Sequence, residues 1–108
     1  VELLLEHGAG IDDKDKNGGT ALMEAAGNGH KQAVELLLQH GANVHDKDDN
    51  GGTALMKAAQ GGRKEVVELL LQHGAGINDK DNDGSTALMK AAFGGYKEVV
   101  ELLLQHGA

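Results

Sequence analysis

The sequence predicts an all-α solenoid built from stacked helix-turn-helix units, and two observations lead to this fold class. The motif Val-Glu-Leu-Leu-Leu occurs four times, starting at Val1 and returning every 33 residues. Residues 17–49 and 50–82 differ at 10 of 33 positions, so 23 are identical. A unit this short cannot bury its apolar residues alone, so its stability must come from stacking on its neighbours.

The first helix of a unit is predicted from the stretch that begins at Thr53. Threonine is a common N-cap residue, and residues 54–59 after it are good helix formers. Gly61 and Gly62 follow and end the helix. We therefore expect a short helix in every unit that begins after a threonine and ends at a glycine-rich tight turn.

The second helix is predicted from about Lys64, because residues 66–71 give a wide apolar face. Gly74 stands where a left-handed helix end is expected, and His73 in the last turn suits the negative end of the helix dipole. The polar segment 76–84 then reads as a loop or a hairpin-like turn. Each unit is therefore helix, tight turn, helix and long turn.

The 33-residue period, the segment 20–25 (Thr-Ala-Leu-Met-Glu-Ala) and the segment 41–44 (Gly-Ala-Asn-Val) together resemble the ankyrin repeat. The family signature is Thr-Pro-Leu-His-x-Ala, and here Ala and Met replace its Pro and His in all three units. The resemblance covers the whole chain. It divides the chain into a partial repeat at 1–16, full repeats at 17–49 and 50–82, and a truncated repeat at 83–108.

Composition argues against several function classes. The net charge is −7, from 10 basic and 17 acidic residues, which disfavours nucleic acid and anionic membranes as partners. With no cysteine, the chain can form neither a disulfide nor a thiol nucleophile. No residue set indicates catalysis or a cofactor, so we expect a protein that is not an enzyme. No signal peptide or membrane-length apolar run is seen, and we expect an intracellular location.

Calcium is the sharpest chemical alternative. Residues 13–18 followed by Glu24 match the oxygen-ligand spacing of an EF-hand loop. The two later copies carry Lys57 and Lys90 where the loop needs a carboxylate, and ordinary turn chemistry explains the same aspartates. Weak calcium binding at the Asp-rich turns stays open as an alternative.

A histidine recurs at the repeat period. Helices of successive units pack about 10 Å apart, whereas zinc ligands must lie about 2 Å from one ion. We therefore expect residues that compensate helix dipoles and no metal site. The four histidines are His7, His40, His73 and His106.

The resemblance implies a concave surface, made of turn tips and first helices, that binds a protein partner. Aromatic residues are common interface anchors, so Phe93 and Tyr96 are the leading candidates. The alternative is that Phe93 covers neighbouring core and Tyr96 packs at a turn. The predicted binding residues are Lys16, Asn17, Glu24, Asn28, Asp49, Asn50, Lys57, Gln60, Asn82, Asp83, Ser85, Lys90, Phe93 and Tyr96.

Both ends of the sequence fall in the same phase of the repeat, since residues 1–9 match residues 100–108 in position. Solitary repeat arrays need polar capping units, so ends of this kind predict exposed leucine faces. The alternative function is therefore a structural or engineered scaffold whose copies associate head to tail.

Overall fold

The computed structural model describes residues 14–108, and over this part of the chain helices joined by turns are the only regular secondary structure. Its six helices are α2 (Ala21–Gly27), α3 (Lys31–Gln39), α4 (Ala54–Gln60), α5 (Lys64–Gln72), α6 (Ala87–Gly94) and α7 (Lys97–Gln105). The predicted all-α repeat fold is confirmed. The partial repeat expected at 1–16 lies outside the described residues except for its last three.

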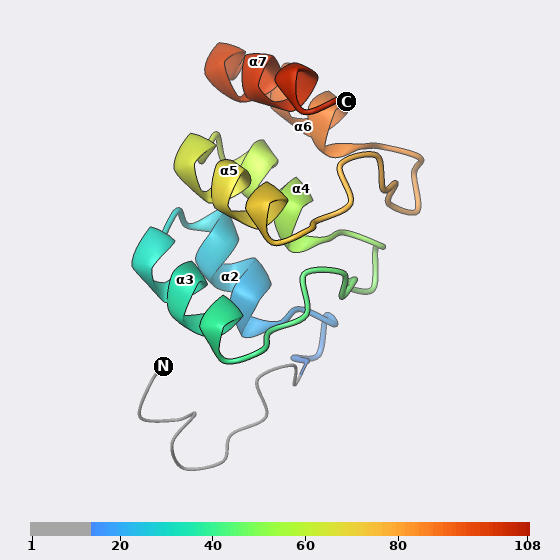
Figure 1. Ribbon diagram of the computed structural model, residues 1–108. Coiled ribbons are helices and arrows are strands. Elements are labelled where there is room, and N and C mark those ends of the chain that lie inside the picture. Colours follow the sequence, from blue (N-terminus) through green and yellow to red (C-terminus); the bar gives the residue numbers. More distant parts are fainter. Residues whose placement is uncertain (1–13) are drawn as a thin grey trace.

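The helices form two layers (Figure 1). One layer is α2, α4 and α6, each packed on the next; the other is α3, α5 and α7. Each first-layer helix also packs on the second-layer helix that follows it. We call these three pairs, each with the long turn before it, the first, second and third units. The long turns project from one side of the stack (Figure 1).

The first helices begin where the threonines predict. Thr53 Oγ1 accepts a hydrogen bond from the Met56 amide at 3.3 Å, which satisfies a free donor at the start of α4. Thr20 and Thr86 cap α2 and α6 in the same way. At the other end of a unit, Gly74 follows His73, the C-cap residue of α5, and has φ +87°, as the sequence predicts.

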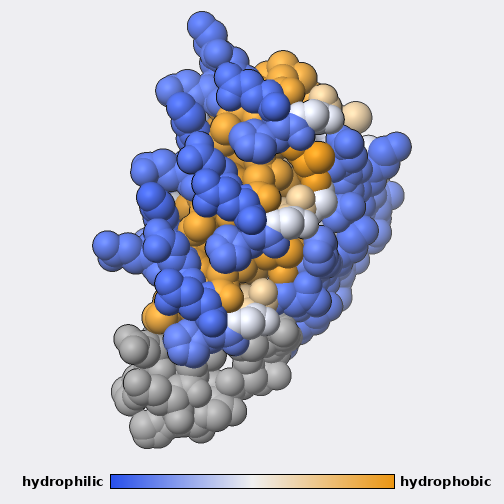
Figure 2. Space-filling view, in the orientation of Figure 1, coloured by the Kyte–Doolittle hydropathy of each residue, from blue (hydrophilic) through white to orange (hydrophobic). Residues whose placement is uncertain are grey.

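The core lies between the two layers and between successive units. Ala26, Ala59, Val67, Leu70 and Leu103 are all 0 % exposed. Alanines on the inner side of the first helices leave room for the larger valines and leucines of the second layer. In Figure 2 the apolar residues run as a stripe from unit to unit, flanked by hydrophilic side chains.

The tight turns between paired helices are linked from one unit to the next. Arg63, at the start of α5, donates from Nε to the Gly27 carbonyl of the preceding unit at 3.2 Å. Tyr96 holds the same position in the third unit, and its ring lies so close to Gly62 that a Cβ there would be 2.6 Å away. Tyr96 therefore packs at the tight turn.

No helix between residues 14 and 108 has the length and apolar character needed to cross a membrane.

Candidate functional site

Each long turn is organised by one aspartate. Asp48 Oδ1 accepts hydrogen bonds from the amides of Asn50 at 3.0 Å and Gly52 at 2.8 Å. The Asp48 amide donates to the Gly52 carbonyl at 2.9 Å, which closes a hairpin-like turn without forming a strand. Asp15 and Asp81 accept the equivalent pairs of amide hydrogen bonds in the other units. This chemistry is the side-chain-to-backbone turn that aspartate favours.

Successive turns are joined into a row. The Asp49 amide donates to the Asn17 carbonyl at 3.1 Å, and the Asn82 amide donates to the Asn50 carbonyl at 2.9 Å. Asn82 Nδ2 also donates to the Asp49 carbonyl at 3.1 Å. The predicted tip residues therefore lie side by side along one edge of the stack, held by backbone contacts.

Two of the turns are tied to the helix that follows them by an ion pair. Lys57 Nζ lies 2.8 Å from Asp48 Oδ2, and Lys90 Nζ lies 2.9 Å from Asp81 Oδ2. The two aspartate side chains are only 8 % and 7 % exposed. The lysine side chains keep more exposure, 37 % for Lys57 and 26 % for Lys90, and the two ion pairs fix the long turns of the second and third units against their first helices.

The carboxyl pKa values follow from these contacts. For Asp48, burial raises the pKa, but the hydrogen bond from Lys57 and the turn amides outweigh it, so the pKa lies below its ordinary value. For Asp81, the hydrogen bond from Lys90 and the Ser85 amide lower the pKa. All three turn carboxylates are therefore ionised at neutral pH, because amide donors from Gly19 and Asn17 lower the pKa of Asp15 as well.

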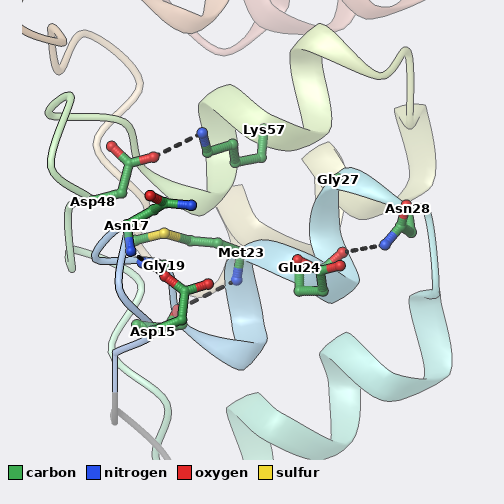
Figure 3. Close-up of a pocket in the computed structure, with 10 residues that line it drawn as sticks. Asp15, Asn17, Gly19, Met23, Glu24, Gly27, Asn28, Asp48 and Lys57 are labelled. Carbon is green, nitrogen blue, oxygen red and sulfur yellow. Dashed lines mark hydrogen bonds and ion pairs between the residues drawn. The ribbon is translucent and has the colours of Figure 1, made fainter.

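A groove of about 350 Å³, which we call the first groove, lies between the first and second units (Figure 3). The turn and α2 of the first unit form one side, and the Asp48–Lys57 pair of the second unit forms the other. The lining residues are Asp15, Asn17, Gly19, Thr20, Met23, Glu24, Gly27, Asn28, Asp48 and Lys57.

A similar groove of about 360 Å³, the second groove, lies between the second and third units. Lys57 borders both grooves, so they adjoin along the stack. The lining residues are Asn50, Gly52, Met56, Lys57, Gln60, Asp81, Asp83 and Lys90.

The predicted binding residues fall into three groups. Eight of them line the two grooves: Asn17, Glu24, Asn28, Lys57, Asn50, Gln60, Asp83 and Lys90. Lys16, Asp49 and Asn82 are exposed on the turn tips, and Ser85 is half-buried there. The two aromatic residues make up the third group. Asp15, Asp48 and Asp81 were expected as turn residues but not as groove residues, although an aspartate at a fixed distance before a glycine in each unit was a readable signal.

The two aromatic candidates behave differently. Phe93, on α6, is 96 % exposed, which excludes the alternative that it covers neighbouring core. Tyr96 is 39 % exposed and packs against Gly62 at the tight turn, the alternative that the sequence left open for it. Tight turns and long turns lie at opposite ends of the first helices, so Tyr96 is separated from the turn tips.

Three of the periodic histidines, His40, His73 and His106, are the C-cap residues of α3, α5 and α7. Nδ1 of His40 and of His106 each lies 2.9 Å from the carbonyl oxygen four residues earlier, in the last turn of its helix. His7 and Asp13 lie outside the described residues. Within residues 14–108, no three histidine or acidic side chains are placed to hold a metal ion together.

A family model described as ankyrin repeats, in three copies, matches residues 1–48 and 41–108. The chain belongs to the ankyrin repeat family. The fit agrees with the two-helix units and hairpin-like turns described above, and it confirms the family that Thr-Ala-Leu-Met predicted. Ankyrin repeats are in general protein–protein interaction modules and not enzymes. No curated protein matches the sequence.

Proposed function

We propose that this ankyrin array is a non-catalytic module that binds a protein partner through one continuous surface. This groove surface consists of the first groove, the second groove and the exposed Phe93 beyond them. It is the surface that the sequence assigned to the turn tips and the first helices.

One observation carries the proposal: several of the positions that differ between the units line the grooves or lie on the first helices beside them. The position that is Glu24 in the first unit is Lys57 in the second, and Gly27 becomes Gln60 and then Phe93. The capping threonines and the Ala-Leu-Met segment, in contrast, are the same in every unit. Stacking requires the shared residues, whereas these differing residues of the first helices are not fixed by it and can serve a partner.

Phe93 is the best anchor on this surface. It sits on α6 four residues after Met89, which is 53 % exposed, and together they place apolar side chains on the outer side of the third unit, beyond the second groove. Large aromatic residues are common hot spots in protein interfaces, where truncation of one commonly costs more than about 1 kcal/mol of binding free energy.

The test is selection of short peptides from a random display library on the folded chain, followed by affinity measurements on Phe93→Ala. The substitution should weaken binding by about fivefold or more, which corresponds to about 1 kcal/mol. Leu104→Ala is the matched control, because Leu104 is also exposed, at 54 %, but lies on α7 away from the grooves. An equal loss in both variants, or none in either, would contradict the proposal.

A second candidate function, association of copies end to end, is favoured by the outer face of the third unit. Met89 is 53 % exposed, whereas Met23 is 3 % exposed and Met56 is 2 % exposed, because the next unit covers them. Leu104 is 54 % exposed, against 9 % for its counterpart Leu38. An apolar face of this kind is suited to another unit of the same type.

Sedimentation velocity over a range of concentrations tests this candidate. Copies that stack should grow in size with concentration, and Met89→Lys should suppress the growth by placing a charge in the contact. A monomer at every concentration would exclude the second candidate and leave the first untouched.

A further inference from the structure

The first and second grooves have the same construction but different charge. Three carboxylates line the first groove, Asp15, Glu24 and Asp48, against the single ammonium of Lys57. The second groove is lined by two carboxylates and two ammonium groups, those of Asp81, Asp83, Lys57 and Lys90. The first groove therefore carries a formal excess of two negative charges, and the second groove is balanced.

Two ion pairs show that the turn aspartate can accept a lysine ammonium group. In the second and third units, the turn aspartate lies within 2.9 Å of a lysine ammonium that comes from the following helix. The equivalent helix position in the first unit is Glu24, and Glu24 lines the same groove as Asp15. The first unit therefore has the turn carboxylate, Asp15. At the helix position where the other units have a lysine that pairs with this aspartate, it has the acidic residue Glu24.

We propose that the first groove binds a lysine or arginine side chain of the partner, with Asp15 and Glu24 as its acceptors. This inference rests on the proposed function, because it names the partner's chemistry at one end of the groove surface. The partner's cation would lie beside Asp15 in the first unit as the Lys57 ammonium lies beside Asp48 in the second unit.

Two further features of the groove suit a long basic side chain. Turn amides hold the Asp15 carboxylate in place, at 2.8 Å from Asn17 and 2.9 Å from Gly19, so it is positioned before a partner arrives. Thr20 and Met23 line the groove as well, with 5 % and 3 % of their surface exposed, so methylene groups of lysine or arginine would meet a small contact area there. The net charge of −7 adds long-range attraction for a basic segment.

The position of Phe93 sets the orientation in which a partner would bind. Phe93 lies near the end of α6 in the third unit, two units along the stack from Asp15 and Glu24. A partner that spans the groove surface would therefore present a basic residue to the first unit and an apolar residue to the third. The expected occupant is an extended or helical segment of mixed basic and apolar character.

The test is a parallel selection of short random peptides on three folded forms of the chain: the natural sequence, Glu24→Lys and Glu68→Lys. Glu24→Lys places a lysine at the position where the other units have one, and its ammonium group should pair with Asp15 and occupy the proposed site. Glu68→Lys makes the same change of net charge on α5, in the second layer, and controls for general attraction. Glu24→Gln serves as a second variant that removes the charge without adding a lysine, and circular dichroism checks each fold.

We expect peptides rich in lysine and arginine from the natural chain and from Glu68→Lys. A basic peptide selected in this way should bind Glu24→Lys about tenfold more weakly and Glu24→Gln with an intermediate loss. Equal affinity for the natural chain and Glu24→Lys would overturn the inference. Selected peptides that depend on Phe93 but carry no enriched basic residue would also overturn it and leave the proposed function standing. Failure to select any peptide that binds the groove surface would count against both.

Discussion

Lys57 Nζ lies 2.8 Å from Asp48 Oδ2, and this contact ties the long turn of the second unit to the helix that follows it. The Lys90–Asp81 pair repeats the contact in the third unit. Each of the two aspartates also accepts two amide hydrogen bonds. Its carboxylate therefore links the backbone of the turn to the lysine of the following helix. The first unit has the same turn aspartate, Asp15, but Glu24 at the lysine position.

Glu24→Lys should stabilise the free chain, because it replaces an acid that lines the groove with Asp15 by the base that pairs with aspartate in the other units. The expected result is a higher melting temperature in circular dichroism at low salt, with the gain reduced at high salt. Glu68→Lys, with the same change of net charge, should not reproduce the gain. A melting temperature lower than that of the natural chain would contradict this account of the turns.

Acid should loosen the long turns. The folded pKa of Asp15, Asp48 and Asp81 lies below the ordinary value, so each carboxylate stabilises the fold above that value, and the contribution is lost as pH falls through the folded pKa. We expect the melting temperature to fall steeply below about pH 4.

Asp48→Asn isolates one of these contributions. Its amide oxygen can still accept from Asn50 and Gly52, but the charge that holds Lys57 is gone. The variant should be less stable than the natural chain at neutral pH and should approach it in acid, which melting curves across this pH range would show. A constant difference in stability at all pH values would contradict the assignment.

Thr53→Ala should destabilise the array by about 1 kcal/mol, the usual cost of losing an N-cap hydrogen bond. Thr53 is 3 % exposed and its hydroxyl accepts from the Met56 amide. Denaturation in urea would measure the change, and Thr53→Ser, which keeps the acceptor, should recover most of it. If serine and alanine behaved alike, the hydrogen bond would not be the cause.

Gly62→Ala should destabilise the array more than Gly74→Ala. Both glycines have positive φ, +71° and +87°, so alanine costs about 1 kcal/mol at either position. At Gly62 the added Cβ would also meet the Tyr96 ring at 2.6 Å, whereas nothing lies within 4 Å of a Cβ at Gly74. Urea denaturation should show the difference, and combining Gly62→Ala with Tyr96→Ala should remove it. If Gly62→Ala still cost more stability than Gly74→Ala when Tyr96 is alanine, contact with the Tyr96 ring would not be the cause.

The fold could be predicted from the sequence because its determinants are local and occur three times. Thr53 at a helix start, the glycine pair after it and Gly74 at a helix end each act within a few residues. Repetition then supplied the tertiary arrangement, since a 33-residue unit has only its neighbours to stack on.

The site was less predictable, because its properties depend on which side chains meet across units. Asp48 and Lys57 are nine positions apart, and nothing in the sequence alone shows that they join as an ion pair across a turn. The exposure of Phe93 was equally undecided, because its counterparts Gly27 and Gln60 do not report how an aromatic ring would lie there. The exposure of Met89, identical in sequence context to the buried Met56, depends only on the neighbouring unit.

The most direct test of the central claim, that a partner binds the groove surface, is amide chemical-shift mapping of the chain as a selected peptide is added. The largest shifts should cluster on Asn17, Glu24, Asn50, Gln60 and Phe93, along the turns and the first helices. Shifts concentrated instead on the outer residues of α3, α5 and α7, with these groove positions unchanged, would contradict it.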